Sequence, residues 1–239
     1  MFGREIQGNF RHVAGVEVLE APLETARIDA KRFYIFAGGR VYPSVTTVLD
    51  ASPDAAIVAW KEAVPQATQD RIKKLATDRG TAIHSMAEDY LNNKIVNPNP
   101  LLKADFLSIK PLLDRIDNIW GLETVLFSDT YKVAGKTDCI AEFDGILSVI
   151  DFKTSSKVKT EDQIQSYFEQ TTCYALMAEE RYGIKIGQIV VIMSVHQVQS
   201  PLLFIQTPQP FVESLKAKIR KFSSENDLSS FFGTGSLSL

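Results

Sequence analysis

The sequence predicts an α/β fold built on one large domain. Strand-like apolar runs at residues 132–143 and 146–152 flank Asp144-Gly145, a dipeptide typical of tight β-hairpins. A helical pattern at 161–182, an apolar run at 187–195 and a helical pattern ending near residue 222 follow. This order of elements is typical of a central mixed sheet flanked by helices. With 239 residues, 45% of them hydrophobic, the chain can bury a sizeable core.

The first 65 residues are expected to form a small elaboration of strands and short helices that packs on this core. Aromatic and β-branched residues predict strands at 16–19, 32–36 and 41–42. Capping residues and proline predict short helices at 43–49 and 53–63.

The main domain is expected at residues 66–222, and it begins with a long helical pattern at 66–91. The side chains of this pattern expected in the core are Ile72, Leu75, Ile83, Met86 and Leu91. Gly80 interrupts the pattern, at a cost of about 1 kcal/mol relative to alanine, and marks either a helix boundary or a close approach to neighbouring strands. A loop, a helix and a first strand are then expected at 92–100, 101–116 and 123–128, and Ser- and Gly-rich residues 223–239 are expected to form a flexible tail.

Composition argues against several classes of protein. The formal net charge of −3 is not that of a general nucleic-acid coat protein. The sequence contains no run of about 18 apolar residues, so no membrane-spanning helix is expected. Residues 1–10 lack the basic and apolar segments of a signal peptide, so none is expected there. We therefore expect a cytoplasmic protein of a bacterial or phage-infected cell, with no membrane partner. Cys139 and Cys173 are expected to be buried free thiols, and two cysteines cannot supply the four thiolates of an iron–sulfur cluster.

The predicted hairpin brings two carboxylates and a lysine together. Asp138 lies near the start of the first strand-like run, and Asp151 and Lys153 lie at the end of the second. Folding at the turn places Asp138 beside Asp151, and residues two apart on a strand share a face. Carboxylates held this close raise each other's pKa unless a hard cation lies between them. The arrangement predicts a Mg²⁺ or Mn²⁺ site suited to phosphodiester hydrolysis.

Short motifs around these residues add a family resemblance. Gly80–His84 fits the pattern G-x-x-x-H, Asp151–Lys153 fits D-x-K after the acid Asp138, and Gln170–Tyr174 fits Q-x-x-x-Y. In this order the motifs resemble the RecB-like branch of the PD-(D/E)XK nuclease superfamily. Residues 43–49 also resemble a segment near the start of its phage and mitochondrial members. The resemblance implies a single PD-(D/E)XK nuclease core.

The resemblance also implies a set of metal ligands. Asp138 and Asp151 are expected to bind the metal ion, together with the backbone carbonyl of Phe152. His84 occupies the position of the motif histidine that binds metal in related enzymes. Glu88, one helical turn further on, either approaches the same metal or is simply solvated.

Other residues are expected to act on the substrate. The resemblance implies that Lys153 orients the attacking water and steadies the developing charge on the phosphate. The alternative is that Lys153 simply neutralises Asp151 or Asp138. Gln170 and Tyr174 are expected to hold a metal-bound water or a phosphate. Glu123, one strand earlier, resembles an acid found before the G-x-x-D segment in some relatives, but it is not counted among the expected metal ligands.

Contacts to DNA are expected near the same site. Thr154 and Ser155 either bind phosphate or cap the following helix, and Tyr167 either stacks on a base of single-stranded DNA or fills the core. Three basic clusters are either solvated faces or phosphate contacts, and the first two flank the predicted site. They comprise Arg71, Lys73, Lys74 and Arg79; Lys153, Lys157 and Lys159; and Lys216, Lys218, Arg220 and Lys221.

The resemblance to the RecB-like branch implies a metal-dependent DNA exonuclease that acts from free ends in recombination, repair or replication. Its expected partners are linear DNA with single-stranded ends and a replication or recombination protein. A structure-specific endonuclease with the same site is the alternative within enzymes. A catalytically inactive nucleic-acid-binding module is the alternative outside them, although it would usually have lost one of Asp138, Asp151 and Lys153.

Overall fold

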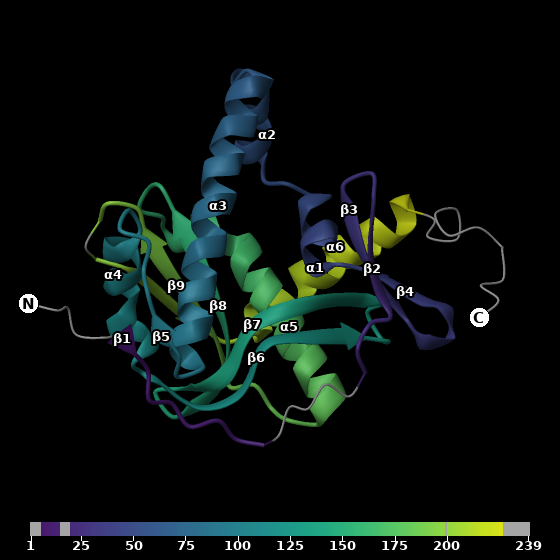
Figure 1. Cartoon of the computed structure of the whole chain (residues 1–239). Helices are drawn as coiled ribbons and strands as arrows, with labels where there is room; N and C mark the ends of the chain where they lie inside the picture. Colours follow the sequence, from purple (N-terminus) through teal and green to yellow (C-terminus); the bar gives the residue numbers. More distant parts are fainter. Residues whose placement is uncertain (1–5, 15–19, 199, 227–239) are drawn as a thin grey trace, which may run out of the picture.

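A five-stranded mixed sheet forms the centre of the computed structural model, which describes residues 6–14, 20–198 and 200–226 (Figure 1). Its strands lie in the order β10-β9-β8-β7-β6. The bounds are β6 Ile116–Ser128, β7 Val133–Phe143, β8 Ile146–Ser155, β9 Gln188–Val195 and β10 Leu202–Gln206. The β8 and β9 strands pair in parallel and the other neighbours pair antiparallel. The predicted central mixed sheet is therefore confirmed.

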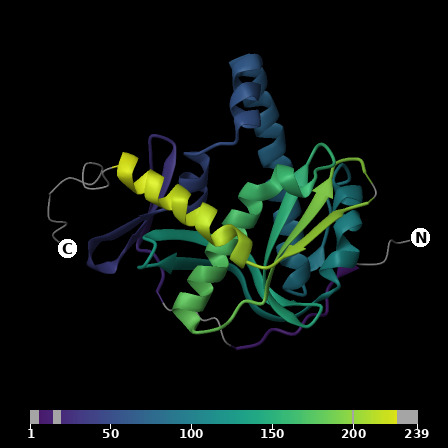
Figure 2. The same ribbon diagram turned by 180° about the vertical axis from the view of Figure 1, so that it is seen from behind.

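Helices cover both faces of this sheet. α5 (Gln165–Tyr182) makes the crossover that the parallel β8–β9 pair requires, and it packs with α6 (Val212–Glu225) on one face (Figure 2). α3 (Gln66–Leu91) and α4 (Lys103–Leu113) cover the other face. Neighbouring residues of β8 alternate between the two cores, with Val149 in the first and Ile150 in the second.

The β7–β8 hairpin has the turn that the sequence predicts. Asp144 and Gly145 both have positive φ, 51° and 77°, as a two-residue hairpin turn of type I′ requires. The register pairs Phe143 with Ile146 and Cys139 with Ile150. That register brings Asp138 next to Asp151, so the feature on which the predicted site depends is confirmed.

An N-terminal unit packs beside one end of the main sheet. It contains the sheet β2 (Glu24–Ile28), β3 (Lys31–Phe36) and β4 (Arg40–Pro43), with the short 3₁₀ turn Ala37–Gly39 between β3 and β4. α1 (Val45–Asp50) follows, and the Ser44 hydroxyl caps it by accepting a 3.0 Å hydrogen bond from the Thr47 amide. Strands at 32–36 and 41–42 and the helix at 43–49 are thus confirmed. The strand expected at 16–19 lies outside the described residues.

The long helix α3 differs from expectation in two ways. It runs unbroken through Gly80, so the predicted helix boundary is wrong, whereas the predicted close approach is confirmed. A Cβ at Gly80 would lie 3.7 Å from Thr154 Oγ1 on β8. Ile72 and Leu75 are not in the core: they are 47% and 61% exposed. The first half of α3 and α2 (Ala55–Ala63) rise above the rest of the domain, where nothing described covers them (Figure 1).

Smaller differences concern short or terminal segments. β6 begins at Ile116 rather than at residue 123, and the edge strand β10, a five-residue segment without clear alternation, was not predicted. α6 continues to Glu225, so residues 223–225 are helical rather than part of a tail; residues 227–239 lie outside the described part of the chain. Two further short strands, β1 (Ile6–Gln7) and β5 (Ile95–Val96), pair antiparallel in a separate two-stranded sheet.

Both cysteines are buried and free, as expected, in the two cores on opposite faces of the sheet. Burial raises the pKa of the Cys139 and Cys173 thiols far above the usual range, so both stay protonated. Among the described residues, none of the helices combines the length and apolar character that a membrane crossing needs.

Candidate active site

Asp138 is held in place by the hairpin that carries it. The backbone amide of Phe152 on β8 donates a 2.8 Å hydrogen bond to Asp138 Oδ2 on β7. Burial by itself raises the pKa of Asp138, but the nearby His84 and Lys153 cations and the Phe152 amide outweigh it and lower the pKa. Asp138 is therefore a carboxylate at neutral pH, aimed by its strand partner.

Asp151 is the most deeply buried acid of the site. Its side chain is 2% exposed, and Lys153 Nζ lies 2.6 Å from its Oδ2 in an ion pair. Hydrogen-bond geometry to that oxygen is nevertheless poor, and Oδ2 accepts no well-formed hydrogen bond from the described residues. Burial, and the charge of Asp138, raise the pKa of Asp151 to about 6 despite the lysine. Such a carboxylate is poised to gain from a cation.

Lys153 lies half-buried between the carboxylates and an aromatic ring. Burial alone would lower the pKa of Lys153, but the carboxylates of Asp151 and Asp138 raise it, so the ammonium form is kept. Nζ also lies 5.2 Å from the centre of the Tyr167 ring in a cation–π contact. Two residues apart on β8, Asp151 and Lys153 face the same cleft, as predicted.

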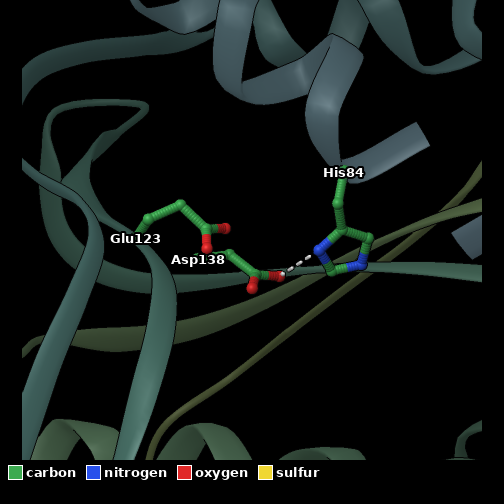
Figure 3. Close-up of side chains that lie close together, drawn as sticks. All are labelled: His84, Glu123 and Asp138. Carbon is green, nitrogen blue, oxygen red and sulfur yellow. Dashed lines mark ion pairs between the residues drawn. The ribbon is translucent and has the colours of Figure 1, made fainter. Parts of the chain in front are cut away.

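His84 reaches the site from α3. Its Nδ1 lies 3.4 Å from Asp138 Oδ2 (Figure 3). The imidazole also meets the edge of the Phe152 ring, with 6.2 Å between ring centres. Burial opposes protonation, but the charge of Asp138 raises the pKa of His84 above its usual value. α3 therefore places an imidazole nitrogen beside the Asp138 carboxylate, which the hairpin holds in position.

Glu123 on β6, rather than Glu88, joins His84 and Asp138. One ligand atom from each of His84, Glu123 and Asp138 lies within 4.8 Å of the others, and Figure 3 shows the three side chains converging. Glu88 does not line the cleft, although its charge helps raise the pKa of the neighbouring Lys136. Helical spacing favours Glu88, which lies one turn from His84, whereas the packing of β6 against β7 places Glu123 beside His84 and Asp138.

These groups line one cleft of about 510 Å³. Its walls also include residues that sequence reasoning missed: Arg32 from β3, Thr46 from α1 and Lys136 from β7. Arg32 Nη2 donates a 3.3 Å hydrogen bond to Thr46 Oγ1, which holds the guanidinium at the cleft. Thr46 falls in the 43–49 segment that carried a resemblance, but no sequence signal marked Arg32. The full lining is Arg32, Thr46, Gly80, Thr81, His84, Glu123, Lys136, Asp138, Asp151, Lys153, Gln170 and Tyr174.

Gln170 and Tyr174 form the α5 wall of the cleft. Gln170 Nε2 donates a 3.3 Å hydrogen bond to the Tyr174 hydroxyl, and burial raises the pKa of Tyr174 well above its usual value. The phenol is thus a neutral hydrogen-bonding group. Gly135 on β7 permits its approach, since a Cβ there would lie 2.7 Å from Tyr174 Cε1.

The residues expected to contact DNA are more scattered. Thr154 is half-buried where α3 crosses β8, and Arg79 is half-buried just before that crossing. Ser155 is buried, and its hydroxyl donates a 2.6 Å hydrogen bond to the Lys157 carbonyl. That local turn occupies the Ser155 proton, so a phosphate contact through it is not supported. Lys157 itself is exposed next to the site.

The ring of Tyr167 contacts two lysine side chains, so it is not open for a DNA base to stack on. Lys153 and Lys159 both lie over its ring, and Lys159 Nζ donates a 3.1 Å hydrogen bond to its hydroxyl. The ring also packs against the core beside α5. Of the two roles considered for Tyr167, the structural one fits this position better.

Comparison with known proteins agrees with this geometry. Residues 114–228, which include Asp138, Asp151, Lys153, Gln170 and Tyr174, match the family model of the PD-(D/E)XK nuclease superfamily. Residues 114–228 belong to the PD-(D/E)XK nuclease superfamily. The predicted family and fold class are therefore confirmed.

Two curated relatives carry the same name. The chain is 30% identical over 170 residues to mitochondrial genome maintenance exonuclease 1 of Homo sapiens, covering 63% of this chain and 49% of the relative. It is 29% identical over 128 residues to the Mus musculus protein of that name, covering 49% and 38%. The chain thus spans about half or less of the length of these relatives. A crystal structure from Eubacterium rectale, of a presumed exonuclease, aligns with 12% identity and a TM-score of 0.39 over 69% of this chain and 76% of that one.

PD-(D/E)XK nucleases typically use divalent metal ions, and the cleft has the donors for one. Carboxylate oxygens, a backbone carbonyl and an imidazole suit Mg²⁺ or Mn²⁺. The buried Asp151 Oδ2, which lacks a well-formed hydrogen bond, is the atom that such an ion would satisfy. The residues present therefore fit the metal that the superfamily implies.

Proposed function

We propose that this protein is a metal-dependent DNA exonuclease that hydrolyses phosphodiester bonds from free ends. The convergence of Asp138, Asp151 and Lys153 with His84 in one cleft carries the proposal. The curated relatives are named exonucleases, which supports the same direction. Linear DNA with single-stranded ends is the proposed substrate, in recombination, repair or replication.

Asp138, Asp151, the Phe152 carbonyl and His84 are the proposed holders of Mg²⁺ or Mn²⁺. When bound, the ion supplies positive charge that neutralises phosphate oxygens during hydrolysis. Asp138 needs no large rearrangement for this task, because the Phe152 amide already orients its carboxylate. Asp151 would be stabilised most by the ion, because burial makes its negative charge costly even beside Lys153.

Lys153 is proposed to position the attacking water and to stabilise charge on the phosphate. Its ammonium is 2.6 Å from Asp151 Oδ2 and remains protonated, so it offers donors to a water or a phosphate oxygen. The cation–π contact with Tyr167 restricts where that ammonium points. A preorganised charge of this kind costs little reorganisation during the reaction.

The cleft walls provide further groups for the DNA backbone. Arg32 is a bidentate donor suited to phosphate, and Thr46 holds it at the cleft. Tyr174 and Gln170 from α5 add neutral hydrogen-bonding groups to the lining of the same cleft. We propose that a strand of DNA enters this cleft past these groups and reaches Lys153.

Digestion of end-labelled linear DNA and closed circular DNA tests this function. Wild type and Lys153→Ala are compared on single- and double-stranded forms with Mg²⁺, Mn²⁺ or EDTA. The proposal predicts metal-dependent loss of linear DNA only, absent in the variant. Cutting of circles would instead indicate an endonuclease with the same site. DNA binding without any metal-dependent cleavage would indicate an inactive binding module.

A further inference from the structure

Glu123 lies directly across from Asp138 in a strained stretch of β6. The ladder pairs Leu122 with Cys139 and Thr124 with Thr137, so Glu123 opposes Asp138 on the neighbouring strand. Its φ is +50°, in the left-handed region that non-glycine residues rarely adopt. Such a conformation is unfavourable and persists where the surroundings impose it. Two acids facing each other across strands add repulsion to that cost.

The acids of the cleft are balanced by cations that lie beside them. His84 neighbours Asp138, and Lys153 neighbours Asp151. Glu123 is in contact with the ammonium of Lys136, which lies two residues before Asp138 on the same strand. The Lys136 side chain is 49% exposed, so solvent screens this pair and the lysine can swing away at small cost.

We propose that Glu123 is a metal-binding residue of this site and that Lys136 is its counter-ion, displaced when a divalent cation binds. This inference rests on the proposed function and adds a carboxylate to its metal site. The convergence of Glu123 with His84 and Asp138 within 4.8 Å supplies the ligand set. Asp151 Oδ2 is buried in the same cleft, where the Lys153 ammonium lies 2.6 Å away without a well-formed hydrogen bond from the described residues, so this oxygen also has coordination to offer a cation.

The two possible roles of Glu123, as a partner in a structural salt bridge or as a metal ligand, lead to different expected results. If Glu123 only pairs with Lys136, removing either partner changes stability and leaves metal affinity unchanged. If Glu123 binds metal, Glu123→Gln weakens the affinity about tenfold or more, as loss of a metal-supporting group typically does. Lys136→Met then has the opposite effect and tightens metal binding, because a competing cation is gone.

Calorimetric titration of Mn²⁺ into the DNA-free protein distinguishes these cases. Wild type, Glu123→Gln and Lys136→Met are compared with Asp144→Asn, which alters an acid paired with Arg115 at the hairpin turn, outside the cleft. Opposite shifts for the first two variants, with Asp144→Asn like wild type, are the expected result. Wild-type affinity in both Glu123→Gln and Lys136→Met would overturn the inference while leaving the proposed function intact. Absence of Mn²⁺ binding in wild type would overturn both.

Discussion

The Phe152 amide donates a hydrogen bond of 2.8 Å to Asp138 Oδ2, and this contact extends the pairing of the two acid-bearing strands into the cleft, just beyond the Cys139–Ile150 pair of their ladder. The hydrogen bond uses the amide of Phe152, so the carbonyl of this residue, which lies between Asp151 and Lys153 in sequence, takes no part in it. The strand geometry of the hairpin therefore fixes one carboxylate and presents a backbone oxygen next to a second. This arrangement needs only the turn at Asp144-Gly145 and the β7–β8 register.

Replacing Lys153 by methionine is expected to separate catalysis from metal binding. Turnover should fall about 10²–10³-fold, as loss of one preorganised donor typically causes. Metal affinity should not weaken, because the ammonium supplies no lone pair and its charge opposes a cation. Single-turnover cleavage rates and Mn²⁺ titration of the same variant check both halves. A parallel loss of metal binding would show that Lys153 mainly shapes the site.

Adding Mg²⁺ is expected to stabilise the folded protein. The ion offsets the burial of Asp151 and its repulsion by Asp138, which together raise the pKa of Asp151. At a concentration of about 100 Kd the gain is about 2.7 kcal/mol, or about 5–10 °C in thermal midpoint for a chain of this size. Thermal melts of wild type and Asp138→Asn measure it. The account is contradicted if Asp138→Asn shows the full wild-type response.

Gly135→Ala is expected to destabilise the protein by about 1–3 kcal/mol, the usual cost of overpacking a core. The new Cβ would lie 2.7 Å from Tyr174 Cε1, so the phenol must move from the cleft wall. Gly80→Ala is the matched control: its Cβ meets Thr154 at an ordinary 3.7 Å, and alanine favours the helix. Urea unfolding should therefore show opposite signs for the two variants, and equal losses would contradict the packing argument.

Arg32→Gln is expected to weaken DNA binding without affecting metal affinity. One phosphate contact fewer should also reduce the salt dependence of binding by about one unit of log–log slope. Arg27→Gln is a suitable control, because Arg27 is exposed and lies opposite Arg32 in the β2–β3 pair. Fluorescence anisotropy in an Asp151→Asn background, where cleavage is blocked, gives both slopes. Equal slopes in the two variants would place the DNA elsewhere.

The hairpin and its acids could be predicted from sequence because they depend on local rules. Asp144-Gly145 determines the turn, and period-two alternation then determines which side chains share a face. Motif spacing also led to His84 and to Tyr174, which the structure places in the same cleft. Each of these inferences needed only one strand pair or one helix.

Other features depended on packing between distant segments. Ile72 and Leu75 have helical core spacing, yet that half of α3 stands clear of the body and leaves them exposed. Helical spacing favours Glu88 as the acid near His84, whereas the β6–β7 register places Glu123 there instead. Arg32 reaches the cleft through the N-terminal sheet, which no motif foretold.

The central claim is that the cleft around Asp151 hydrolyses DNA with a divalent metal ion. The most direct test measures the initial rate of nucleotide release from end-labelled linear DNA by wild type and Asp151→Asn, with Mg²⁺ and with EDTA. The account predicts release by wild type with Mg²⁺ only, and a rate for Asp151→Asn at the level of the EDTA control. Mg²⁺-dependent release that survives in a folded Asp151→Asn variant would contradict it.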